Sequence, residues 1–196
     1  MARFPGISEV SVGMRKYMSL AAAKVVVAAA ALTIAGCAVV DRDEAGQRQA
    51  VENFYTQAVA LNVQGLPRQE ELTRLAPLMS PALLELFEQA RQAQAEDFKR
   101  HQGTEPPLVQ GSIFFSLFEG AQRLVAILPS EAPNMWSVTL AYGQGTDAFE
   151  WIDDVRLVRL NGQWLVDDID FMGQWDFARS GWLSNQLIAV QAQARQ

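Results

Sequence analysis

The residues best suited to chemistry lie on either side of Asn161-Gly162, a dipeptide typical of two-residue hairpin turns. Pairing the flanking strands through such a turn puts Asp153 opposite Asp170 and places Asp168 diagonally on the same face. Directly opposed like charges destabilise a sheet, so this arrangement requires water, a cation, an arginine or a shared proton. The sequence therefore predicts that three carboxylates converge at one end of the hairpin.

This group of carboxylates has three interpretations. It binds a cation such as Ca²⁺ through hard oxygens, or one carboxyl with a raised pKa acts as a general base, or it is a solvated strand end. The last is the usual outcome for such a pattern, so we assign no metal and no catalytic residue. The predicted ligand-binding set is Asp153, Asp168, Asp170, Trp151 and Tyr142. A bulge in the hairpin would shift the register and separate the carboxylates.

Histidine and cysteine are too scarce for most metal and nucleophile chemistry. The 196 residues include one of each, His101 and Cys37, which excludes Cys-cluster sites and most His-dependent sites. His101 follows Lys99 and Arg100 at the predicted end of a helix, just before Gly103. Positive charge complements the helix dipole there, so we predict a capping or solvated role for His101. We expect no cofactor.

The N-terminal segment has the layout of an export signal. Four basic residues and one acidic residue precede eleven uncharged residues at 25–35. Ile34, Ala35, Gly36 and Cys37 resemble the signal of bacterial lipoproteins position by position. The resemblance implies cleavage before Cys37 and acylation of its sulfur, and two or three acyl chains form a stable membrane anchor.

Two other interpretations of this segment are an uncleaved transmembrane helix and a buried core helix. The uncharged run from residue 25 to residue 40 has 16 residues. A helix needs about 20 apolar residues to span a bilayer. We therefore prefer a cleaved signal.

The preferred interpretation divides the chain into a signal peptide at 1–36, an acylated cysteine with a short tether at 37–46, and a domain at 47–196. Residues 1–36 hold four of the 16 basic and one of the 22 acidic residues, which leaves a formal charge of −9. This charge repels phosphate backbones, so we expect membrane contact through the lipid and no nucleic-acid partner. Ala38 stands where lipoproteins kept at the inner membrane often carry Asp, so the resemblance favours the periplasmic face of the outer membrane.

Hydrophobic periodicity divides the domain into helices followed by strands. Apolar residues recur near a 3.6-residue period at about 45–63 and 81–100, a shorter helical region begins near Gln69, and Ser80-Pro81 is typical of a helix start. The predicted strands are Gln122–Leu128, Trp136–Tyr142, Phe149–Leu160 and Gln163–Phe171. A terminal helix is predicted at about Trp182–Gln193. Helices first and antiparallel strands afterwards indicate an α+β fold.

This order of elements resembles the NTF2-like superfamily, in which a curved antiparallel sheet wraps N-terminal helices into a cone with a pocket. The segments Leu78–Leu84, Ser116–Gly120 and Trp164–Ile169 are similar to an uncharacterised family of bacterial secreted and lipid-anchored proteins, known only as a domain of unknown function. The resemblance spans about residues 48–190. It implies a fold and carries no catalytic motif.

We therefore expect a lipid-anchored envelope protein whose domain binds an unidentified small ligand or an envelope protein and is not an enzyme. The aromatic run Trp175–Trp182 is a candidate cover for the pocket or a binding surface. The alternative is a small NTF2-like isomerase or dehydratase that uses a carboxylate of Asp153, Asp168 or Asp170, with Tyr142 as a hydrogen-bond donor. Fold analogy alone supports this alternative.

Overall fold

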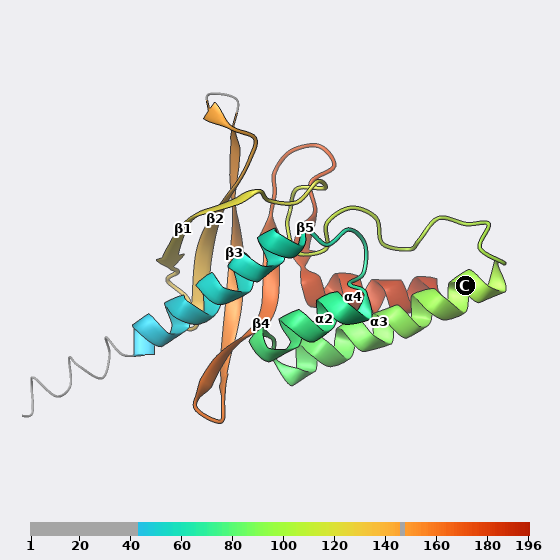
Figure 1. Ribbon diagram of the computed structural model, residues 1–196, viewed down its shortest axis with the longest axis horizontal. Helices are drawn as coiled ribbons and strands as arrows, with labels where there is room; N and C mark the ends of the chain where they lie inside the picture. Colours follow the sequence, from blue (N-terminus) through green and yellow to red (C-terminus); the bar gives the residue numbers. More distant parts are fainter. Residues whose placement is uncertain (1–42, 146–147) are drawn as a thin grey trace, which may run out of the picture. The chain divides into compact units, whose positions relative to one another are not determined.

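Figure 1 shows a computed structural model of the protein, which describes residues 43–145 and 148–196. The predicted signal peptide and the predicted acylation site at Cys37 lie outside the described residues. Within those two ranges, no helix combines the length and the apolar character that crossing a bilayer requires. Residues Ala45–Gln196 pack into one unit.

The first described helix covers residues 43–61 and packs through one apolar face. Val51, Phe54, Tyr55 and Ala58 lie at helical spacing and have no exposed surface. The helix stops where Asn62 takes a positive φ of 43°. Burial of this single stripe is what the period of the sequence predicted.

The next helical elements are α2 (Gln69–Leu75), the 3₁₀ turn η1 (Ala76–Leu78) and α3 (Pro81–Arg100). The predicted start of α3 is confirmed. The Ser80 hydroxyl accepts a hydrogen bond from the Leu83 N–H at 3.0 Å, and Pro81 occupies the first turn, where its missing N–H costs nothing. Leu83, Phe87 and Ala90 form the buried stripe of α3.

Five strands form one open antiparallel sheet, in which each strand pairs with the next along the chain. They are β1 (Arg123–Pro129), β2 (Met135–Tyr142), β3 (Phe149–Leu160), β4 (Gln163–Met172) and β5 (Ser180–Trp182). The sequence predicted the first four strands. It did not predict β5, which the aromatic run contributes as a three-residue edge strand.

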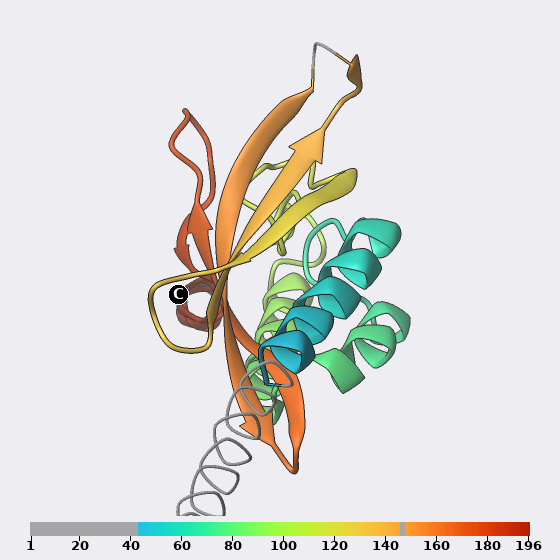
Figure 2. The same cartoon turned by 90° about the vertical axis from the view of Figure 1, so that its left-hand side faces the viewer.

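The helices lie before and after the sheet in the chain. Figure 2 shows the helix of residues 43–61 and α2 on one side of the sheet. The last helix, α4 (Leu183–Gln193), follows β5 and packs against α3 and β4. The α+β class is therefore confirmed. The NTF2-like arrangement has its helices N-terminal to the sheet, whereas here α4 follows the strands, at the place of the terminal helix predicted at about Trp182–Gln193.

Aromatic side chains fill the core between these layers. Phe114 and Phe115 come from the irregular segment before β1 and have no exposed surface. The Phe114 ring centroid lies 5.7 Å from that of Phe54 and 5.4 Å from that of Phe87, and the Phe115 centroid lies 6.1 Å from that of Tyr55. These edge-on and tilted contacts are typical of a close-packed aromatic core.

A bulge in the β3–β4 hairpin changes the predicted register. The four residue pairs next to the turn match the prediction. The register then shifts between Arg156 and Leu157, because β4 contains one extra residue at this point. As a result Asp154, and not Asp153, faces Asp170. The predicted pairing of Asp153 with Asp170 is therefore wrong.

Candidate functional site

Asp153 is a fully buried carboxylate with four hydrogen-bond donors. Its Oδ1 accepts from the Ser116 hydroxyl and from the Met172 N–H at 3.2 Å. Its Oδ2 accepts from the Ser116 N–H and from the Trp151 Nε1–H, both at 3.0 Å. The carboxylate thereby ties the irregular segment before β1 to strands β3 and β4.

Burial raises the pKa of the Asp153 carboxyl above its ordinary value of 3.8, although the hydrogen bonds from Ser116, Trp151 and Met172 favour the charged form. The Ser116 hydroxyl in turn accepts a hydrogen bond from the Gly173 N–H at 3.1 Å. The carboxylate and the hydroxyl are both occupied by partners inside the protein. This arrangement is an internal brace for the chain.

Asp168 stabilises the start of α4. Its Oδ1 accepts from the Ser184 N–H at 3.0 Å and from the Ile169 N–H at 2.9 Å. Its Oδ2 accepts from the Ser184 hydroxyl at 2.6 Å and from Arg156 Nη2 at 3.3 Å. A carboxylate on β4 thus supplies the helix cap that Trp182, the residue at the N-cap position, cannot supply with its side chain.

Asp170 is partly exposed and faces Asp154 across the sheet. Burial, followed by the nearby charges of Asp154 and Asp168, raises the pKa of Asp170. Asp154 accepts a hydrogen bond from the Ser137 hydroxyl at 2.7 Å. Adjacent strand residues point to opposite faces, so Asp153 lies on the other face of the sheet from Asp154 and Asp170. The bulge therefore divides the three predicted carboxylates between two faces.

The two aromatic members of the predicted set lie apart. Trp151 is 6% exposed, donates to Asp153, and contacts the rings of Phe149 and Trp175 at centroid distances of 5.9 and 6.2 Å. Tyr142 is 37% exposed and pairs with Phe149 at the end of β2. It lies four positions along β2 from the residue opposite Asp153, or about 13 Å at the rise of a strand.

A cavity that the sequence pattern did not predict lies beside α3, and we call it the α3 cavity. It has a volume of about 410 Å³ and lies between the second half of α3, the turn before α2 and the segment that follows α3. Its apolar lining residues are Leu66, Pro67, Ala95, Phe98, Pro106 and Pro107. Charged side chains also line it, namely Arg68, Arg91, Asp97, Lys99 and Glu105. The cavity thus combines an apolar wall with charges of both signs.

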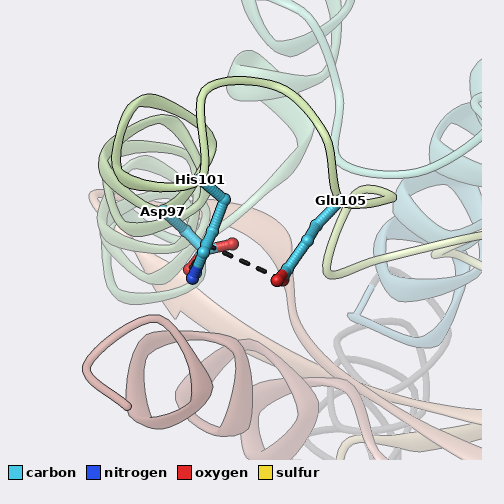
Figure 3. A group of neighbouring side chains, drawn as sticks. All are labelled: Asp97, His101 and Glu105. Carbon is cyan, nitrogen blue, oxygen red and sulfur yellow. Dashed lines mark ion pairs between the residues drawn. The ribbon is translucent and has the colours of Figure 1, made fainter.

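Three side chains near this cavity point toward one another, and we call them the His101 cluster: Asp97, His101 and Glu105 (Figure 3). Asp97 and His101 are four residues apart on α3 and share one face of it. Gln102 and Gly103 then take φ values of 54° and 70°, so the chain reverses and returns Glu105. His101 Nδ1 lies 3.2 Å from Asp97 Oδ1 and 3.7 Å from Glu105 Oε2.

The sequence contained part of the signal for this cluster. His101 occupies the C-cap of α3, the place that the sequence analysis gave it. The spacing of Asp97 and His101 identifies two of the three side chains once α3 is predicted. Glu105 could not be found in this way, because its return depends on two successive left-handed residues after the helix.

Comparisons with known proteins identify no activity. No family model matches the chain, and no curated protein matches it. Among solved structures the chain is similar to a protein of unknown function from Bacteroides thetaiotaomicron VPI-5482. The two are 20% identical, the match covers 69% of this chain and 96% of the other, and the TM-score is 0.43.

Proposed function

We propose that the protein is a lipid-anchored envelope protein whose domain binds a small amphipathic ligand in the α3 cavity. The anchor is acylated Cys37, after cleavage of residues 1–36, at the periplasmic face of the outer membrane. The proposed fold family is NTF2-like, on the support of helices packed on one side of an antiparallel meander. The protein acts as a binding module and not as an enzyme.

The α3 cavity is the observation that carries this proposal. Its volume of about 410 Å³ falls in the range of roughly 300 to 1,000 Å³ that is typical of small-molecule sites. Phe98 lines it and is 58% exposed, so its ring is available to an apolar ligand. Apolar walls with charged side chains beside them suit a ligand that has an apolar body and a polar end.

The state of the buried carboxylates favours binding over catalysis. Asp153 accepts from four donors and has no exposed surface. Asp168 is 1% exposed and is engaged by the start of α4 and by Arg156. A general base needs a substrate within hydrogen-bond reach, and these two carboxylates already accept hydrogen bonds from donors of the protein itself.

The ligand site is tested by filling the cavity. Ala95 is exposed on α3 and lines the cavity, so Ala95→Phe is expected to exclude the ligand. Ala82→Phe is the matched control, at an exposed position in the first turn of the same helix. Native mass spectrometry of the full chain, released from detergent, should show a bound small molecule in the wild type and in Ala82→Phe only. The same occupancy in both variants, or an empty wild type, would reject the cavity as the site.

The membrane anchor is tested separately. The predicted export signal, the lone cysteine of the chain and the acidic charge of the remainder support it. Mass spectrometry of protein from membranes should find a mature chain that begins at acylated Cys37, and Cys37→Ala should keep residues 1–36. A mature chain with a free thiol at Cys37 would contradict the proposed anchor and leave the cavity proposal intact.

A further inference from the structure

The His101 cluster offers one imidazole nitrogen and two carboxylates. This mixed donor set suits divalent transition metals such as Zn²⁺, whereas Ca²⁺ and Mg²⁺ prefer oxygen ligands alone. The ligand atoms of Asp97, His101 and Glu105 all lie within 4.8 Å of one another. Backbone structure fixes this convergence, because the first two residues share a helix face and a left-handed turn returns the third.

The environment of His101 Nδ1 suits a cation. This atom is buried and has no hydrogen-bond partner, although two carboxylate oxygens lie within 3.7 Å of it. An imidazole nitrogen that carries no proton is repelled by carboxylate oxygens, and a divalent cation among the three atoms replaces that repulsion with attraction to all three.

The neighbouring arginine neutralises only part of the cluster. Arg100 Nη2 forms an ion pair with Asp97 Oδ1 at 3.4 Å, and the same nitrogen donates to the Ala194 carbonyl. Among the described residues, the ion pairs of Arg100 do not include one with Glu105. Asp97 is only 6% exposed, so its charge is partly removed from water and depends on its neighbours.

The two separations that involve His101 are close to those of a tetrahedral ion. Bonds of about 2.0 to 2.2 Å from Zn²⁺ to nitrogen and oxygen place two ligand atoms about 3.3 to 3.6 Å apart. The observed separations from His101 Nδ1 are 3.2 Å to Asp97 and 3.7 Å to Glu105. The Glu105 side chain is 58% exposed and follows the turn, so it is free to close the small remaining difference.

We propose that Asp97, His101 and Glu105 bind one Zn²⁺ ion. Three protein ligands leave a fourth position for water or for an incoming group, as in zinc sites that are not closed. Asp97 and Glu105 also line the α3 cavity, so the ion lies at its border and adds a Lewis acid beside the apolar wall. The metal site does not depend on what occupies the cavity.

Titration of the full chain tests this site. The chain is purified in detergent without a histidine tag, stripped of metal with a chelator, and titrated with Zn²⁺ by calorimetry. One ion per chain is expected. His101→Ala and Glu105→Gln should each weaken binding by more than about tenfold, since even outer-shell partners of a metal act on that scale. The matched control is Glu96→Gln, at an exposed residue of α3 that contacts Gln92.

A second readout separates loss of the site from loss of the fold. Co²⁺ in place of Zn²⁺ should give the intense visible absorption of a tetrahedral ion in the wild type and in Glu96→Gln, and not in Glu105→Gln. Glu105→Gln changes one exposed loop residue, so its circular dichroism should match that of the wild type. Absence of stoichiometric Zn²⁺ binding, or unchanged affinity in Glu105→Gln and His101→Ala, would overturn the metal site. The native mass measurement on Ala95→Phe is unaffected by that result.

Discussion

Two regions of the molecule bring acidic side chains together, and they differ in how their polar atoms are satisfied. In the β3–β4 hairpin, Asp153 and Asp168 are almost completely buried, and each carboxylate accepts four hydrogen bonds. At the end of α3, Asp97 and Glu105 face a buried imidazole nitrogen that has no hydrogen bond. Both regions contain charges, but the two buried hairpin carboxylates have full sets of donors, whereas His101 Nδ1 has no hydrogen bond among the described residues.

The difference separates structural acids from candidate ligands. A buried carboxylate with a full set of donors stabilises the fold, and removing it leaves the donors unpaired. A cluster with an unpaired buried nitrogen between carboxylates is stabilised when a metal ion binds to it. The hairpin therefore should respond to mutation through stability, and the His101 cluster through metal affinity.

The largest effect is expected from Asp153→Asn. The amide has one acceptor oxygen, and its NH₂ group would face two of the four donors that now point at the carboxylate. Leaving two buried donors unpaired should cost roughly 2 to 6 kcal/mol, at about 1 to 3 kcal/mol for each. Urea unfolding followed by Trp fluorescence measures this loss.

Asp154→Asn is the control for that variant, since Asp154 lies next in sequence but on the opposite, partly exposed face. It should not lower the free energy of unfolding by more than about 0.5 kcal/mol, because the Asn oxygen can still accept from Ser137 and the repulsion with Asp170 is removed. Equal losses in both variants would mean that Asp153 is not an internal brace.

The pH dependence of stability also distinguishes Asp153 from an ordinary carboxylate. Its pKa is raised in the folded state by burial, so the folded protein holds this proton more tightly than the unfolded chain does. Stability from this group is then lost as the pH rises from the ordinary value of 3.8 through the raised folded value. Unfolding curves across this interval should fall more steeply for the wild type than for Asp153→Asn. If the stability of the wild type and of Asp153→Asn changed in parallel with pH, the raised pKa of Asp153 would be contradicted.

Ser184→Ala tests the second satisfied carboxylate. It removes the hydroxyl that donates to Asp168 at 2.6 Å and leaves the backbone N–H of the same residue in place. Loss of one hydrogen bond to a charged group should cost about 1.5 to 3 kcal/mol. Ser180→Ala, at an exposed residue of β5, is the matched control and should stay near the wild type. An unchanged free energy of unfolding in Ser184→Ala would show that the cap of α4 does not need the hydroxyl.

Gly103→Ala changes the turn that returns Glu105 to the His101 cluster. Gly103 has a φ of 70°, where an L-residue costs about 1 to 2 kcal/mol. The variant should lose stability on that scale and should also bind Zn²⁺ more weakly than the wild type. Gln102→Gly is the complementary variant, because Gln102 already has a φ of 54° and should tolerate glycine without loss. If Gly103→Ala bound Zn²⁺ as tightly as the wild type, the conformation of this turn would not be required for the metal site.

Local signals in the sequence predicted much of this fold. The Ser80-Pro81 start of α3 and the Asn161-Gly162 turn depend on a few neighbouring residues, and both are present as predicted. The buried stripe of the first described helix follows from its 3.6-residue period. Each of these features depends on residues that are close together in the sequence, so the sequence alone is enough to predict it.

Features that depend on distant contacts could not be predicted. The bulge in β4 places Asp168 opposite Arg156 and against the start of α4, a contact with a helix 16 residues further along the chain. Phe114 is apolar, but only its packing on Phe54 and Phe87 makes an irregular segment part of the core. Glu105 joins the His101 cluster through backbone angles that composition does not reveal.

The smallest effect is expected from Asp170→Asn, in the same hairpin. Asp170 faces Asp154, and its pKa is raised by burial and by the charges of Asp154 and Asp168. The folded state therefore holds this proton more tightly, and stability is lost as the pH rises through the raised value. Removing the charge should stabilise the protein at neutral pH by about 0.2 to 1 kcal/mol, the scale of a cross-strand pair. The gain should shrink in acid, where Asp170 is protonated. A loss at neutral pH would instead mean that the ionised Asp170 carboxylate has a favourable partner in the folded state, which outweighs its repulsion with Asp154.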